Sequence, residues 1–148
     1  MTNGRKLVAI EQDRLYELDE QIGFLLRKAN QRHVAIFAKH ISDLTPPQFA
    51  ALAKLEEVGP TSQNQLGAMV AMDAATIKGV IDRLKARKLV ASAPDREDRR
   101  RIVVSLTAEG RSIVGGLLAA AATITEETLA PLNAREAATL LRLLTRLT

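Results

Sequence analysis

Two short apolar runs that bracket an arginine-rich loop most constrain how this chain can fold. Residues 89–93 (LVASA) and 102–106 (IVVSL) are apolar and partly β-branched, and the loop between them carries Arg96, Arg99, Arg100 and Arg101. Such runs on either side of a short polar loop are typical of a β-hairpin. The segment therefore predicts two strands joined by a basic turn, narrow enough to enter a groove of DNA.

A helical pattern precedes this segment near the N-terminus. From residue 15 the apolar side chains recur at spacings of three and four, at Leu18, Ile22, Leu25, Leu26, Ala29, Ile36, Phe37 and Ile41. This spacing is typical of an amphipathic helix. We expect one long helix over about residues 13–40.

Capping residues mark the start of the next helix. Thr45 supplies an N-cap hydroxyl, Pro46 fits the first helical position, and Gln48 completes a capping box. Gly59 and the proline after it end this helix. Its buried stripe is expected at Phe49, Leu52 and Leu55.

Two further helices follow in close succession. Ser62 starts a short helix in which Leu66, Met69 and Val70 are expected to face inward, and Asp73 caps the next one. The apolar stripe of that second helix is Ile77, Val80, Ile81 and Leu84. Only a tight turn separates the two helices, so the pair predicts a helix-turn-helix.

Two apolar helices are expected at the C-terminal end, capped by Thr107 and Asn133. Residues 115–122 (GGLLAAAA) are mostly small and would let another helix approach closely. We interpret this segment as a dimer interface. The alternative is that these helices close a core within one chain, and the sequence leaves both possibilities open.

Composition sets broad limits. The chain has 148 residues, 47% of them hydrophobic, and a net charge of +4, so it can fold around a core and bind an anionic partner. It has no cysteine, which excludes disulfides and thiolate metal sites. No apolar run approaches the ~20 residues of a membrane span, and the N-terminus does not resemble a signal peptide. We expect a soluble, cytoplasmic protein without a membrane partner.

The expected elements together predict a mainly α-helical fold with a small β-hairpin. Residues 45–106 would form a winged helix-turn-helix, the hairpin being its wing. Residues 1–44 and 107–148 would form a helical dimerisation region. The functional expectation is a regulator that binds double-stranded DNA as a homodimer.

This order of elements resembles the MarR family of bacterial winged-helix regulators across nearly the whole chain. The most specific match is in the wing, where Asp95-Arg96-Glu97-Asp98-Arg99-Arg100 precedes Val103, Val104, Leu106, Thr107 and Gly110. Residues 76–84, TIKGVIDRL, resemble the family's recognition helix. Two positions depart from the pattern: Gly79, where a larger and often basic residue is common, and Lys88, where a glycine usually ends the helix.

The resemblance implies a set of DNA-contacting residues. The recognition helix would lie in the major groove, the start of the preceding helix would bind phosphates, and Arg100 would enter the minor groove, oriented by an ion pair with Asp98. The expected contacts are Ser62, Gln63, Asn64, Asp73, Ala74, Ala75, Thr76, Lys78, Arg83, Asp98, Arg99 and Arg100.

Residues 18–27 and 31–33 are similar to a subgroup of this family that regulates catabolism of aromatic acids. That similarity implies a small effector, either an aromatic acid or an aromatic acyl-CoA, and no cofactor. The effector would bind near Arg32, His33, Phe37 and His40. The alternative for the two histidines is an ordinary structural role in the helix. They are seven residues apart, ~10 Å along a helix, too far to share one metal ion, so no metal site is expected.

Other classes of protein fit less well. The sequence contains no glycine-rich phosphate loop, nucleophile elbow or cluster of metal ligands, so no catalytic residue and no enzyme activity are expected. A helical protein-interaction module, whose basic hairpin binds an acidic partner instead of DNA, remains the alternative function. The leading interpretation is a repressor released from a palindromic operator by its effector.

Overall fold

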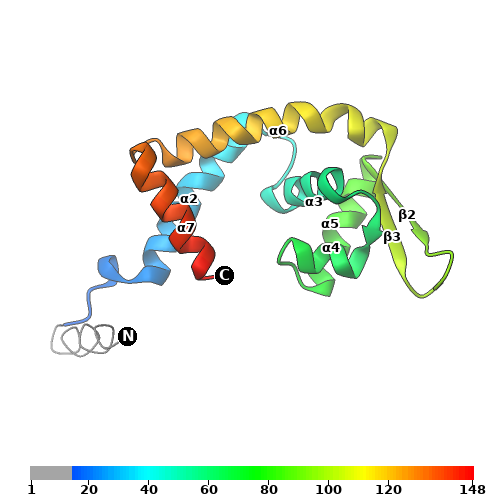
Figure 1. Ribbon diagram of the computed structural model, residues 1–148, viewed down its shortest axis with the longest axis horizontal. Helices are drawn as coiled ribbons and strands as arrows, with labels where there is room; N and C mark the ends of the chain where they lie inside the picture. Colours follow the sequence, from blue (N-terminus) through cyan, green and yellow to red (C-terminus); the bar gives the residue numbers. More distant parts are fainter. Residues whose placement is uncertain (1–14) are drawn as a thin grey trace. The chain divides into compact units, whose positions relative to one another are not determined.

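The computed structural model describes residues 15–148. The chain divides into two compact units, residues 1–33 and 34–148, which are described separately. Figure 1 shows the order of the elements along the chain, which is helical except for a small sheet.

The N-terminal helix starts later than its periodicity predicts. Residues 13 and 14 lie outside the described residues, and the α-helix α2 spans Ile22–His40, after a short 3₁₀ helix, η1, at Leu18–Glu20. Between them Gln21 is extended, with φ −87° and ψ 136°. The Gln21 side chain donates to the Glu17 carbonyl at 3.0 Å, a local bond that competes with helix formation. The prediction of one uninterrupted helix was therefore wrong between residues 15 and 21, whereas its expected start at residue 13 lies outside the described residues.

Helix α3, Pro46–Val58, has the predicted boundaries. The Thr45 hydroxyl accepts a hydrogen bond from the Gln48 N–H, and the Gln48 side chain accepts one from the Thr45 N–H, which completes the capping box. At the other end Gly59 has φ 78°, a conformation that glycine adopts without strain. Leu52 and Leu55 are buried as expected, and Phe49 packs partly buried against the same core.

The helix-turn-helix consists of α4, Gln63–Met69, and α5, Ala74–Ala86. Ser62 and Asp73 are their N-caps, as predicted. Met69 was expected inside but is 48% exposed. A Cβ on Gly67 would lie 3.0 Å from Ile77, so α5 approaches α4 closely at Gly67, and this contact turns Met69 outward.

The hairpin forms as predicted, with β2 at Val90–Pro94 and β3 at Ile102–Leu106. A third strand, β1, Thr61–Ser62, was not predicted and pairs antiparallel with β3, giving the order β1-β3-β2. Two residues are too few for an alternating pattern to be visible in the sequence. Pairing of β1 with β3 joins the start of α4 directly to the wing.

The chain continues into α6, Ala108–Leu129, and α7, Ala134–Arg146, capped by Thr107 and Asn133 as predicted. No single helix among residues 15–148 is long and apolar enough to cross a membrane. Helices α6 and α7 together reach the length and apolar composition of a membrane span, but they are bent by 104° relative to each other.

The core of the second unit lies among α3, α4, α5 and the sheet, which are grouped together in Figure 1. Its largest buried side chains are Leu52, Leu55, Leu66, Ile77, Ile81, Leu84 and Val104. This packing fixes the directions of α5 and of the wing, so the expected DNA-contacting residues are carried on a single packed framework.

Candidate nucleic-acid interface

The tip of the wing is an ordered turn. The Arg101 carbonyl accepts from the Asp95 N–H at 2.8 Å, and the Arg101 N–H donates to the Asp98 carbonyl at 2.9 Å. Arg100 Nε lies 3.6 Å from Asp98 Oδ1, and the Arg100 side chain is 95% exposed. The predicted ion pair is present, and it leaves most of the guanidinium free to contact an anion.

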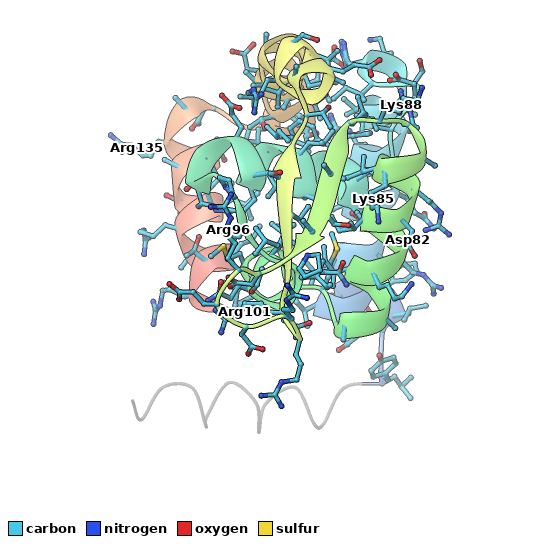
Figure 2. The ribbon with its side chains drawn as sticks, turned by 90° about the vertical axis from the view of Figure 1, so that its right-hand side faces the viewer. Asp82, Lys85, Lys88, Arg96, Arg101 and Arg135 are labelled. Atoms are coloured by element: carbon cyan, nitrogen blue, oxygen red, sulfur yellow. The ribbon has the colours of Figure 1, made fainter. Side chains whose placement is uncertain are left out.

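A hollow of about 360 Å³ lies between this tip and the start of α4. It brings together residues from both segments: Ser62, Gln63, Asn64, Gln65, Asp98, Arg100, Arg101 and Ile102. Figure 2 shows the loop from which Arg96 and Arg101 extend. Five residues that the sequence predicted as DNA contacts on separate elements thus share one surface.

Ser62 caps the start of α4 at this surface. It is 5% exposed, and its hydroxyl accepts a hydrogen bond from the Gln65 N–H at 3.2 Å. The adjacent Asn64 is exposed and Gln63 is half-buried. Side chains and N–H groups at a helix start can bond phosphate oxygens, so this end of α4 suits a nucleic-acid backbone.

The first turn of α5 is open to solvent. Asp73 Oδ1 accepts from the Thr76 N–H at 2.7 Å, and this backbone hydrogen bond lowers the pKa of the Asp73 carboxyl from its ordinary value. Ala74, Ala75 and Thr76 are all exposed. Their small side chains leave the helix surface accessible to a base edge.

The next turn of α5 carries an ion pair. Lys78 Nζ lies 2.9 Å from Asp82 Oδ2, and this hydrogen bond lowers the pKa of the Asp82 carboxyl. Figure 2 shows Asp82 and Lys85 along one side of α5, with Lys88 beyond the end of this helix. Lys78 therefore has an intrahelical partner that a phosphate would have to replace.

A second hollow, of about 550 Å³, lies between α5 and the start of α3. Its lining includes three predicted contacts, Ala75, Thr76 and Arg83, together with Thr45, Pro47, Gln48, Gly79 and Val80. Eight of the twelve predicted DNA-contacting residues thus line one of two hollows, one at the wing and one at the recognition helix, whereas Asp73, Ala74, Lys78 and Arg99 line neither. Arg99 lies at the exposed wing tip.

The predicted effector residues have different surroundings. In the first unit Arg32 is exposed and His33 is half-buried. In the second unit Phe37 is 4% exposed and packs edge-on against Phe49, with ring centroids 5.9 Å apart. Phe37 thus contributes to the core.

His40 is joined to the end of α6. His40 Nε2 lies 2.6 Å from Glu127 Oε1, and Lys39 Nζ lies 3.5 Å from Glu127 Oε2. The hydrogen bond from His40 lowers the pKa of the Glu127 carboxyl. Among residues 15–148, no three acidic or histidine side chains are grouped so that they could hold a metal ion.

Four polar residues escaped prediction. Gln65 and Arg101 line the wing hollow, and Thr45 and Gln48 line the second one. Arg101 belongs to the arginine run, so the sequence carried a signal for it. Gln48 was assigned only to its cap, because nothing in the sequence places the start of α3 beside α5.

The fold and this surface define a winged helix-turn-helix DNA-binding regulator, and the chain belongs to the MarR family, whose model matches residues 42–101. It is 44% identical over 134 residues to the HTH-type transcriptional repressor NicR of Pseudomonas putida, covering 89% of this chain and 85% of NicR. The family assignment confirms the resemblance drawn from the wing and the recognition helix. It favours a DNA target over the protein-interaction alternative.

Two solved structures are similar over most of the chain. A probable transcriptional regulator from Pseudomonas aeruginosa is 53% identical, with a TM-score of 0.85 over 89% of this chain and 100% of that one. BpsR of Bordetella bronchiseptica is 43% identical, with a TM-score of 0.86 over 90% of this chain and 97% of BpsR. The BpsR structure concerns regulation of its DNA binding by 6-hydroxynicotinic acid.

Proposed function

We propose that this protein is a dimeric repressor that binds a palindromic operator and is released by an aromatic acid. The observation that carries the proposal is the wing hollow. There an exposed Arg100, paired with Asp98, shares one surface with the start of α4. Such a surface supplies a minor-groove arginine and phosphate-binding groups on one framework.

The DNA contacts divide by role. Ser62, Gln63 and Asn64 would bind or shape the phosphate site, and Arg99 and Arg100 would reach the minor groove with Asp98 orienting Arg100. The first turns of α5 would lie in the major groove. Its contacts would be Asp73, Ala74, Ala75, Thr76, Lys78 and Arg83.

The dimer would be formed by residues 1–44 and 107–148, with residues 45–106 as the DNA-binding domain. Helix α7 supports this division because Leu140, Leu141 and Leu143 are exposed on it, as is Leu147 directly after it. A Cβ on Gly115 or Gly116 of α6 would meet open space. A two-fold dimer requires an operator with two related half-sites about one helical turn apart, ~34 Å.

The effector would be a small aromatic carboxylic acid, and an aromatic acyl-CoA is the second candidate. The similarity to BpsR supports the first and makes 6-hydroxynicotinic acid the compound to test first. Arg32, His33 and His40 would recognise the carboxylate, with Phe37 shaping the site from the core. The effector would act by favouring a dimer whose two α5 helices no longer fit the half-site spacing.

The same proposal places the protein in the cytoplasm, where its DNA lies, and gives it no catalytic role, no cofactor and no metal. Its relatives are transcriptional regulators. Regulation by an effector requires only a difference in affinity between two states of the dimer.

The test uses a DNA duplex selected from a random pool by the purified protein. Replacing Arg100 with alanine should weaken binding to this duplex by ~1–3 kcal/mol, measured by fluorescence anisotropy. Arg135→Ala, on α7, is the matched control and should bind as the wild type does. Added salt should reduce affinity steeply, because phosphate contacts release counterions.

Titration of the preformed complex with 6-hydroxynicotinic acid tests the effector. Release of DNA at a concentration where benzamide, which lacks a carboxylate, has no effect would support the proposal. Equal release by both compounds, or by neither, contradicts recognition of this acid. Unchanged affinity of the Arg100→Ala variant contradicts the role of the wing.

A further inference from the structure

One face of α5 carries two very small residues followed by an arginine. Ala75, Gly79 and Arg83 are spaced four apart, so they lie along the same side of the helix. Arg83 Nη1 lies 3.4 Å from the position that a Cβ on Gly79 would take. The guanidinium therefore lies over the backbone at Gly79, in space that a larger side chain at position 79 would fill.

The charged side chains next to Arg83 on α5 pair with each other and not with Arg83. The neighbouring charges Lys78 and Asp82 pair with each other at 2.9 Å. Within the described residues, 15–148, Arg83 forms no ion pair. Its donors are thus available to a molecule that enters the second hollow.

The hollow itself offers few other polar groups. Thr45, Gln48 and Thr76 line it, but the Thr45 and Gln48 side chains hold the capping box of α3, with the Gln48 side-chain oxygen 3.1 Å from the Thr45 nitrogen. Thr76 adds a single hydroxyl. Much of the remaining lining is Pro47, Ala75, Gly79 and Val80. The guanidinium is therefore the strongest hydrogen-bond donor at this site, and it stands beside a largely apolar wall.

Guanine is the base whose major-groove edge matches such a donor. It presents two adjacent acceptors, O6 and N7, to the two parallel N–H groups of a guanidinium, whereas adenine and cytosine present an amino donor. We propose that Arg83 reads one guanine in each half-site and that Gly79, by lacking a side chain, gives it the reach to do so. This inference rests on the proposed placement of α5 in the major groove.

The experiment starts from the duplex selected by the wild-type full-length protein. Each guanine is replaced in turn with 7-deazaguanine, which lacks only the N7 acceptor. At one guanine per half-site we expect a loss of affinity of about 5- to 100-fold. With Arg83→Ala the same replacement should have no effect, and a new selection should show no preference for guanine there.

Gly79→Leu is the second variant and leaves Arg83 in place. Its Cβ would meet only the flexible end of Arg83, and Gly79 lines the open hollow, so we expect the fold to survive while the guanine preference falls. Lys78→Ala should weaken binding to all sequences alike, because a phosphate contact carries no base information. Arg135→Ala should change neither the affinity nor the preference.

The outcomes separate the two proposals. If the wild type selects no sequence at low salt, the DNA-binding function itself is wrong, and this inference falls with it. If the wild type selects a duplex and Arg83→Ala keeps the same sensitivity to 7-deazaguanine, only the role of Arg83 is overturned. A wild-type complex insensitive to every 7-deazaguanine also overturns it.

Discussion

Lys88 occupies a backbone conformation that side chains disfavour. Its φ is 61°, in the left-handed region, at the junction between α5 and β2. Lys88 is one of the two positions at which the sequence departs from the family pattern, in which a glycine usually ends this helix. The structure keeps the glycine-like backbone with a lysine, at a cost in strain of about 1–2 kcal/mol.

Lys88→Gly should therefore raise the free energy of unfolding. We expect a gain of about 0.5–1 kcal/mol, less than the full strain because glycine also makes the unfolded chain more flexible. Urea unfolding followed by circular dichroism measures the change. Lys85→Gly is the matched control, since Lys85 lies inside α5, and it should lose about 1 kcal/mol. Equal losses for both variants would show that position 88 is not strained.

At the scale of elements, the start of α6 is fixed to the junction between α5 and β2. The Leu89 carbonyl accepts from the Thr107 N–H at 3.1 Å, and the Lys88 carbonyl accepts from the Thr107 hydroxyl at 2.7 Å. Gly110 lies directly on the Leu89 carbonyl, which leaves no room for a Cβ. This joint connects the long helix α6 to the segment that carries the wing.

Gly110→Ala should break this joint. The added methyl group would clash with backbone rather than with a flexible side chain, so we expect a loss of about 1–3 kcal/mol in thermal or urea unfolding. Gly79→Ala serves as the control, because its Cβ would meet only the end of Arg83 at 3.4 Å. That variant should gain about 0.5–1 kcal/mol, as expected for a glycine replaced within a helix. A neutral Gly110→Ala would mean that α6 shifts freely over the junction.

At the scale of the whole molecule, several large apolar side chains among the described residues remain exposed to solvent. Leu140 and Leu143 lie three residues apart on one side of α7 and are 37% and 43% exposed. Large apolar side chains exposed together on one side of a helix are typical of an interface. The proposed dimer would bury it.

Replacing both Leu140 and Leu143 with glutamate should convert the dimer to a monomer, because each introduced charge would be desolvated in the interface. Sedimentation or light scattering at micromolar concentration measures the mass. We also expect the monomer to bind a two-half-site duplex much more weakly. The control is Arg142→Glu, a neighbouring exposed position that adds charge without removing an apolar side chain. A wild-type protein that is monomeric at this concentration would contradict the proposal.

The local structure could be predicted from the amino-acid sequence alone. Thr45, Ser62, Asp73, Thr107 and Asn133 each cap the helix that they were expected to cap. Caps and apolar spacings act over a few residues, so one chain contains all the information needed to read them. The arginines of the wing were identified for the same reason.

Contacts between distant segments, in contrast, became visible only in the folded protein. Strand β1 exists because Thr61 and Ser62 pair with β3, and Met69 turns outward because α5 packs closely at Gly67. The hollow that Arg83 shares with Gln48 depends on the packing of α3 beside α5. These features arise from contacts between residues far apart in the chain, and neither periodicity nor capping encodes such contacts.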